Sequence, residues 1–259
     1  MSSFNDDGSI RIDNGNIIAA VGKKRSGKTG LALVILRSFP HDVIVIDPAG
    51  DDGPVGDGVV EWSGPVSELP RSFPEHERAR PGERVILRYR PDAGSTTYLE
   101  DMDAVVGVAL AHSTRERPAL LVVHEMGVLA KSNRVPPHTR RVLQHSRHSG
   151  LICVFTMPRP ITVDPQVIGQ ADLVYVFELP NASDRKRIAE TIGWPLDSLD
   201  AAMEDMPVYW SLRFDANEAK PPPDETDMRL VMVPPLPADV VDDAIRWSRS
   251  VPAPARELV

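Results

Sequence analysis

The most constraining feature of this sequence is a glycine- and lysine-rich segment that matches the pattern G-x-x-x-x-G-K-[ST]. It lies between an apolar run at residues 16–21 and a helical pattern at residues 28–38. A strand, a glycine loop and a helix in this order form a P-loop, in which backbone N–H groups surround a phosphate at a helix N-terminus. We therefore predict that one continuous segment binds ATP: Gly22, Lys23, Lys24, Arg25, Ser26, Gly27, Lys28, Thr29 and Gly30. In such loops the lysine (Lys28) bridges the β- and γ-phosphates, and the hydroxyl of Thr29 binds Mg²⁺.

The rest of the chain alternates apolar runs with helical patterns. Strands are predicted at 43–46, 59–62, 84–89, 119–123, 151–156, 173–177 and 208–214, and helices at 98–113, 138–148, 184–192 and 196–206. This alternation predicts an α/β fold with a mostly parallel central sheet flanked by helices. We divide the chain into an N-terminal segment (1–15), a P-loop core (16–214) and a proline-rich C-terminal tail (215–259) with one short helix at 238–248.

Composition limits the class of protein. Charged residues make up 25% and hydrophobic residues 42% of the chain, as in ordinary globular proteins. No apolar run is long enough for an integral membrane segment, the first residues do not resemble a secretory leader, and the single cysteine, Cys153, fits a reducing compartment. We therefore expect a cytoplasmic location.

The charge is distributed unevenly. The formal net charge is −8, yet no acidic residue lies between Glu125 and Asp164. A basic window of this kind can face a polyanion or a nucleotide phosphate. Its basic residues are Lys131, Arg134, Arg140, Arg141, Arg147 and Arg159, with His138, His145 and His148 beside them. The three histidines lack metal-ligand spacing, so we expect no metal site there.

A second motif is the apolar run 119–123 followed by His124 and Glu125. P-loop motors place two acids at the end of such a strand; the first holds the Mg²⁺ shell and the second polarises the attacking water. Glu125 fits the second role and is our candidate catalytic base, although a solvent-facing pair at a strand end is the alternative. His124 stands where the first acid would be, and a neutral imidazole is a poor partner for Mg²⁺.

A third motif, Asp47-Pro48-Ala49-Gly50-Asp51, follows the strand at 43–46. It is similar to a signature of the HerA/FtsK superfamily of P-loop ATPases, although Asp-Pro is also a common turn opener. Asp47 is a further candidate Mg²⁺ ligand. The segment from Arg147 through Met157 to Glu178 also resembles that superfamily, but Met157 stands where the family has a glutamine that senses the γ-phosphate. A thioether cannot donate a hydrogen bond, so Arg159 is a candidate replacement.

The resemblance covers residues 16 to about 214 and implies a RecA-like (ASCE) P-loop core. Members act as rings, typically hexamers, that couple ATP hydrolysis to movement of double-stranded DNA. A neighbour's arginine reaches the γ-phosphate in such rings, and Arg147 is our first choice, followed by Arg140 and Arg141. Lys131 and Arg134 are candidates for contacts with DNA phosphates in a central pore. For each of these residues, a solvated surface position is the alternative.

The P-loop strand begins near residue 16, so we expect no large amino-terminal domain of the kind that cellular members carry. This favours a viral genome-packaging ATPase, located in the host cytoplasm or on the virion and docking on a capsid vertex or a membrane protein. Two other functions stay open. One is a nucleotide-binding subunit that has lost hydrolysis, as His124 and Met157 suggest. The other is a filament or secretion assembly ATPase that moves protein.

Overall fold

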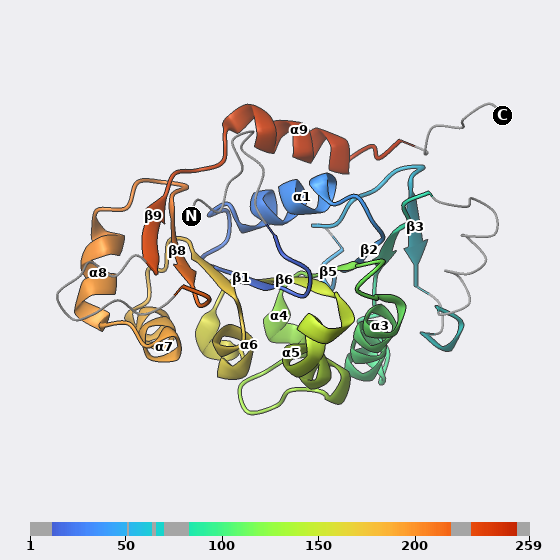
Figure 1. Cartoon of the computed structure of the whole chain (residues 1–259), viewed down its shortest axis with the longest axis horizontal. Helices are drawn as coiled ribbons and strands as arrows, with labels where there is room; N and C mark the ends of the chain where they lie inside the picture. Colours follow the sequence, from blue (N-terminus) through green and yellow to red (C-terminus); the bar gives the residue numbers. More distant parts are fainter. Residues whose placement is uncertain (1–11, 51, 64–65, 70–82, 219–228, 253–259) are drawn as a thin grey trace.

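A nine-stranded sheet runs through the centre of the molecule (Figure 1). The computed structural model describes residues 12–50, 52–63, 66–69, 83–218 and 229–252. Strands β1 to β7 are parallel to one another, β8 is antiparallel to β7, and β9 is antiparallel to β8. The strand order across the sheet is β3 (Val59–Trp62), β4 (Ile86–Tyr89), β2 (Val43–Ile46), β5 (Leu120–Val123), β6 (Ile152–Met157), β1 (Ile17–Val21), β7 (Leu173–Val176), β8 (Ser211–Asp215) and β9 (Leu230–Val233).

Helices cover both faces of the sheet (Figure 1). One face carries α1 (Lys28–Ser38) and α9 (Ala238–Ser248). The other face carries α3 (Tyr98–His112), α4 (Met126–Leu129), α5 (Pro137–Ser149), α6 (Pro165–Gly169) and α7 (Ala182–Ile192). Helix α8 (Leu196–Glu204) packs against α7. Because both faces are covered, the central strands β1, β2, β5, β6 and β7 are buried along their whole length. The predicted α/β fold with a mostly parallel sheet is confirmed.

The start of β8 and the presence of α4 differ from the sequence-based expectation. Strand β8 begins at Ser211 instead of residue 208, because a turn at 207–210 precedes it, in which Tyr209 has a φ of 67° and the N–H of Trp210 donates to the carbonyl of Pro207. Helix α4 was not predicted, because its four residues are too few to show a helical period.

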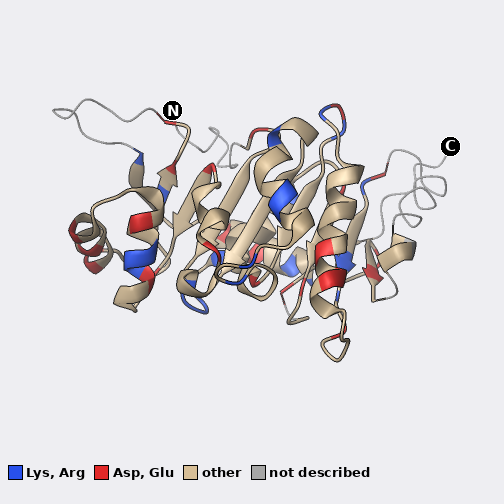
Figure 2. Cartoon of the chain, turned by 90° about the horizontal axis from the view of Figure 1, so that it is seen from below, with Lys and Arg blue, Asp and Glu red and all other residues tan. Residues whose placement is uncertain are grey.

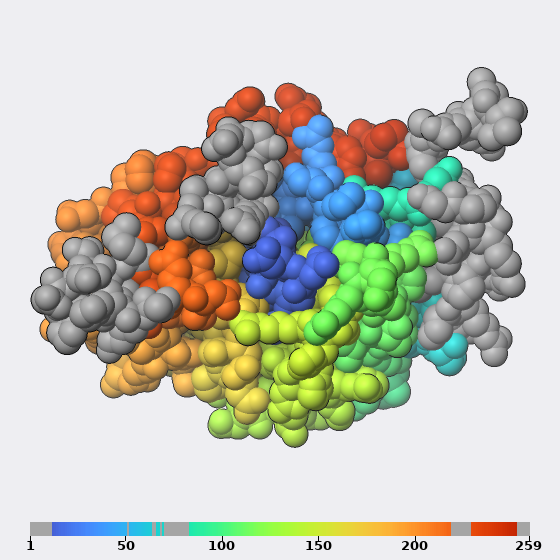
Figure 3. All heavy atoms as spheres, viewed as in Figure 1, coloured from blue at the N-terminus to red at the C-terminus, as the bar shows by residue number. Residues whose placement is uncertain are grey.

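The segment predicted as a C-terminal tail packs on the core. Strand β9 pairs with β8, and α9 lies along α1 (Figure 1). In the space-filling view, red atoms of the C-terminal part lie next to blue atoms of the N-terminal part (Figure 3). The two helices approach closely at Gly30, where an added Cβ would lie 3.1 Å from Cγ1 of Val241. The domain boundary at residue 215 stays a prediction, but residues on both sides of it share one sheet.

Charges are interspersed over the helices on the face seen in Figure 2, where most of the ribbon is neutral. Among the helices of the described ranges, none has both the length and the apolar character needed to span a bilayer.

The start of α5 is capped by a neighbouring helix. Its N-cap residue, Pro136, has no side-chain hydrogen bond to offer. Instead the buried carboxylate of Asp103, on α3, accepts hydrogen bonds from the backbone N–H groups of His138 (3.0 Å) and Thr139 (2.8 Å) and from the Thr139 hydroxyl (2.7 Å). These bonds satisfy N–H groups that a helix start otherwise leaves without a partner. The capping carboxylate therefore fastens α5 to α3.

We expect Asp103→Ala to lower the free energy of unfolding by about 2 kcal/mol, because it leaves the buried donors of α5 unsatisfied. Urea unfolding measures this value. Glu100→Ala, an exposed change on the same helix, is the control and should shift the free energy by less than about 0.5 kcal/mol. Equal losses in both variants would contradict the capping role.

Candidate functional site

The glycine-rich segment forms a loop at the carboxyl end of β1. Gly22 and Gly27 have φ angles of 152° and 115°. A Cβ added at Gly22 would lie 2.7 Å from Cβ of Phe177, so a larger residue cannot fit. The N–H of Gly22 donates to the carbonyl of Met157 (3.2 Å), and that of Lys23 to the carbonyl of Glu178 (2.9 Å). The loop is thus fixed to the ends of both strands that flank β1.

The donors inside this loop suit a phosphate. Lys28 is 8% exposed, and its Nζ donates to the carbonyl of Lys23 at 2.6 Å. The hydroxyl of Ser26 is buried and has no partner among the described residues. Burial lowers the pKa of Lys28 to about 8, although the charges of Asp52 and Glu125 oppose the shift. A bound anion would stabilise the protonated amine, so the loop fits the triphosphate of a nucleotide.

Glu125 lies across from the loop. Strand β5, which it follows, is separated from β1 by β6, so the two strands are roughly 10 Å apart. Glu125 is half-buried, its charge acts on Lys28, and its N–H donates to Oγ1 of Thr156 at 3.3 Å. Its backbone is left-handed (φ 54°, ψ 54°), a conformation that is uncommon for non-glycine residues and is enriched at functional sites. A strand separation of roughly 10 Å is wide enough for a terminal phosphate and a water between the two strand ends.

A second carboxylate, Asp52, lies closer to the loop and was missed in the sequence. Its Oδ1 is 3.4 Å from Oγ1 of Thr29, and of the two acids it has the larger effect on the pKa of Lys28. A hydroxyl and a carboxylate oxygen side by side are the hard ligands that Mg²⁺ prefers, so the pair fits that ion. A signal for this carboxylate was present in the sequence. Mg²⁺ prefers carboxylate ligands, and His124, the residue after β5, cannot supply a carboxylate, so an acid from another segment was needed.

Asp47 does not fit the Mg²⁺ role predicted for it, because its oxygens already have partners. Its Oδ2 accepts from Arg88 Nη2 (2.7 Å) and from the N–H of Gly53 (2.9 Å), and its Oδ1 accepts from the N–H of Gly50 (3.0 Å). Burial alone would raise the pKa of Asp47, but the hydrogen bonds from Arg88 and the loop hold it below its usual value. Asp47 and Arg88 therefore shape the loop that presents Asp52. Asp51, the acid in the motif, lies outside the described residues.

His124 is fully buried at the end of β5. Neither ring nitrogen has a hydrogen-bond partner among the described residues, and burial lowers its pKa, so the imidazole is neutral. A neutral, enclosed ring is not a ligand for a hard cation.

The candidate arginines whose contacts are known make them with residues outside the loop. Arg147 lies at the opposite edge of the sheet, where its guanidinium pairs with Asp172, the residue before β7, and donates to Oδ1 of Asn217 at 3.0 Å. Arg159 pairs with the buried Asp184 at 2.6 Å. Met157 is buried in the core, so its side chain cannot sense a phosphate. Arg140 donates to the carbonyl of Val135 (3.2 Å), and Arg141 is exposed.

Lys131 and Arg134 occupy an exposed loop after α4, on the edge where β5 ends. The N–H of Arg134 donates to the carbonyl of Lys131 at 2.8 Å, and Lys131 also bridges to Val163. Both side chains are accessible to a partner.

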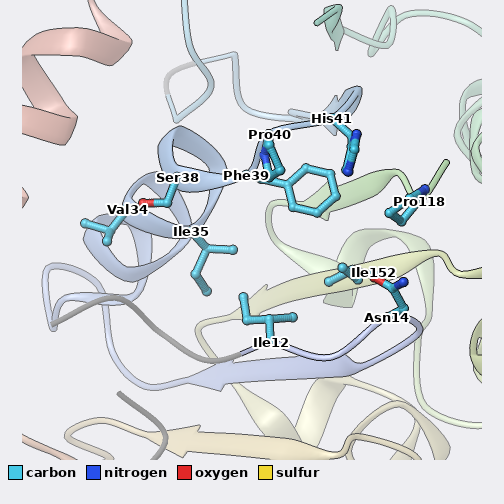
Figure 4. A pocket seen from close by; sticks show the side chains of 10 residues that line it. All are labelled: Ile12, Asn14, Val34, Ile35, Ser38, Phe39, Pro40, His41, Pro118 and Ile152. Carbon is cyan, nitrogen blue, oxygen red and sulfur yellow. The ribbon is translucent and has the colours of Figure 1, made fainter. Parts of the chain in front are cut away.

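A cavity of about 250 Å³ at the opposite edge is separate from this site (Figure 4). Apart from Asn14, Ser38 and His41, its lining side chains are apolar, and it has no carboxylate or lysine. Within the described ranges, no group of three or more His, Cys, Asp or Glu side chains could hold a metal ion.

We expect the affinity for pyrophosphate to fall as the pH rises through about 8, because Lys28 binds an anion only in its protonated form. Calorimetric titration at pH 7 and pH 9 measures the change. Lys28→Arg keeps its charge over this range and is the control; its affinity should hold steady or rise. The same fall in both proteins would show that Lys28 does not titrate at the binding site.

Comparison with protein-family models gives no match, and comparison with curated proteins gives none. Solved structures do match. The genome packaging NTPase B204 from Sulfolobus turreted icosahedral virus 2, in complex with AMPPCP, has a TM-score of 0.62 and 18% identity, over 85% of this chain and 98% of its own. B204, the DNA-packaging ATPase from Sulfolobus Turreted Icosahedral Virus, gives 0.58 and 18%, over 86% and 99%.

EssC (ATPases 2 and 3) from Geobacillus thermodenitrificans has a TM-score of 0.50 and 12% identity, over 90% of this chain and 43% of its own. At these identities, the likeness concerns the fold. The P-loop ATPase fold expected from the motifs is confirmed at that level: this chain shares its fold with the B204 NTPase.

Proposed function

We propose that this chain is an ATPase that works as a ring-shaped motor and moves double-stranded DNA in viral genome packaging. The observation that carries the proposal is the pairing of a phosphate-binding loop, residues 22–30, with a carboxylate, Glu125, one intervening strand away. The shared fold of the B204 packaging NTPase supports the same function. A loop alone would argue only for nucleotide binding.

In this proposal each residue has one task. Backbone N–H groups of the loop and Lys28 hold the β- and γ-phosphates and offset the charge that grows on them. Glu125 accepts a proton from the water that attacks the γ-phosphorus, and the bond to the ADP oxygen breaks. Its fixed backbone conformation limits where the carboxylate can point.

Thr29 and Asp52 would hold Mg²⁺, which neutralises charge on the β- and γ-phosphate oxygens when bound. Asp52 would supply the carboxylate that His124 cannot, either directly or through a coordinated water. Asp47 and Arg88 would not contact the ion; they keep the loop that carries Asp52 in place.

The moved substrate is proposed to be DNA. Lys131 and Arg134 project from the edge of the sheet that carries the nucleotide site, where they would contact DNA phosphates in the centre of a ring, which we propose to be a hexamer. Arg147 lies at the other edge, so a role in trans requires that edge to face the neighbour's loop and Arg147 to leave Asp172. A capsid vertex or a membrane protein is the proposed docking partner, in the host cytoplasm or at the virion.

We expect Glu125→Gln to bind ATP like the wild-type protein but to lower turnover by about 10²- to 10⁴-fold, because an amide cannot accept the proton. Lys28→Ala should instead weaken ATP binding. Phosphate release and equilibrium binding of a fluorescent ATP analogue measure the two effects. A wild-type protein with no more turnover than Glu125→Gln would favour the alternative function, a subunit that binds nucleotide without hydrolysing it, for which His124 is the supporting observation.

Asp52→Asn should raise the Mg²⁺ concentration needed for half-maximal ATP binding by about tenfold, since an amide is a weaker ligand than a carboxylate. Titration of Mg²⁺ at a fixed ATP concentration gives this value without relying on turnover. Asp57→Asn, an exposed change farther along the same connection, is the matched control and should leave it unchanged. If both variants respond as the wild-type protein does, Asp52 does not act on the ion.

Double-stranded DNA should stimulate ATP turnover, and Lys131→Ala with Arg134→Ala should abolish the stimulation while the basal rate stays. Turnover measured with and without DNA tests this. A stimulation that survives in the double variant would place the DNA contact elsewhere. Absence of any stimulation, together with activation by a protein partner, would support an assembly ATPase that moves protein.

A further inference from the structure

A larger cavity, of about 630 Å³, opens beside the phosphate-binding loop. Its volume lies within the range of small-molecule sites, roughly 300–1,000 Å³. Loop residues 27–31 form part of its wall, so the cavity is continuous with the phosphate site. The remaining wall comes from β7, β8, β9, the connection at 234–237 and α9. Most of these residues lie in the C-terminal part of the chain, which no motif had pointed to as part of a binding site.

The wall is built mainly from rings and aliphatic groups. Phe177 forms one side and lies directly under the loop, since a Cβ added at Gly27 would be 3.1 Å from its Cε1. Tyr209, Pro235, Val241 and Ile245 also line the cavity. The charged groups beside these are Arg25 and Asp242, whose side chains are exposed, and Lys28 in the loop. Such a wall favours a flat, weakly polar ligand that carries hydrogen-bonding groups at its edge.

Tyr209 is the most distinctive part of the wall. It is 59% exposed and has a φ of 67°, a left-handed conformation that is uncommon for an aromatic residue. The turn at 207–210 that imposes this conformation also places Tyr209 in the wall of the cavity. An exposed ring held at a cost in backbone energy fits a residue that stacks on a ligand.

We propose that this cavity binds the base and ribose of the nucleotide, with Tyr209 stacked on the base and α9 closing the far side. The proposal rests on the proposed function, because the loop at 22–30 would hold the phosphates of the same molecule. The base needs a site that is continuous with the phosphate site, and this cavity shares residues Gly27, Lys28 and Thr29 with it. Asp242, at the rim, is an acceptor for a ribose hydroxyl or an amino group of the base.

Comparing ATP with tripolyphosphate distinguishes the contribution of the base and ribose to the affinity from that of the phosphates. Wild-type protein and variants are titrated by calorimetry with ATP and with inorganic tripolyphosphate, both with Mg²⁺. Tyr209→Gly removes the ring and suits the positive φ, so it should fold normally; Val208→Gly, a change of the neighbouring exposed residue, is the control. We expect Tyr209→Gly to weaken ATP binding by about tenfold or more, and to leave tripolyphosphate binding within about twofold.

A second variant fills the cavity from the other side. Val241→Phe adds a ring where α9 faces the loop, and Val240→Phe adds the same ring at a more exposed position of the same helix. The first should weaken ATP but not tripolyphosphate, and the second should weaken neither. Circular dichroism of each variant identifies any that fails to fold. If Val241→Phe does not fold, the ATP and tripolyphosphate affinities of Tyr209→Gly decide whether the base binds in this cavity.

The outcomes separate the two proposals. Unchanged ATP affinity in a folded Tyr209→Gly, with tripolyphosphate still bound, would place the base elsewhere and overturn this inference alone. If the wild-type protein binds neither ATP nor tripolyphosphate, or if Lys28→Ala leaves both affinities intact, then the proposed function fails and the inference fails with it.

Discussion

The parallel pairing of β1 between β6 and β7 is the constraint on which the site depends. It fixes the loop to the carbonyls of Met157 and Glu178, at the ends of the two neighbouring strands. It also inserts β6 between the loop and Glu125, which sets the spacing between the strand ends that carry them. Since all these strands point the same way, their carboxyl ends meet at one edge, and the chemistry gathers there.

The carboxylate next to Thr29 does not come from the end of β5. At the end of β5, where a carboxylate would be expected, the chain has a buried and neutral imidazole, and the carboxylate beside Thr29 comes from the connection after β2. That connection is held by a buried ion pair between Asp47 and Arg88, whose side chains are 0% and 3% exposed. An unpaired charge at this depth would be costly, so the two residues keep each other and the loop in position.

Patterns in the sequence predicted those helices and strands whose bounds depend on neighbouring residues in the chain. The bounds of α1, β2 and α9 match the expected residues, because a glycine, a proline or a change of period marks each end. The position of Asp52 could not be predicted, because it depends on Arg88 in a strand far along the chain. The cavity beside the loop could not be predicted either, since β9 and α9 reach it only through non-local packing on β8 and α1.

The close approach of Val241 to Gly30 has a mechanical consequence. Helix α1 starts at the phosphate-binding loop and is held between the sheet and α9, with no side chain at residue 30 to separate the two helices. A side chain at residue 30 would push α9 away from α1, so the absence of one keeps the C-terminal helix seated against the element that begins at the phosphate-binding loop.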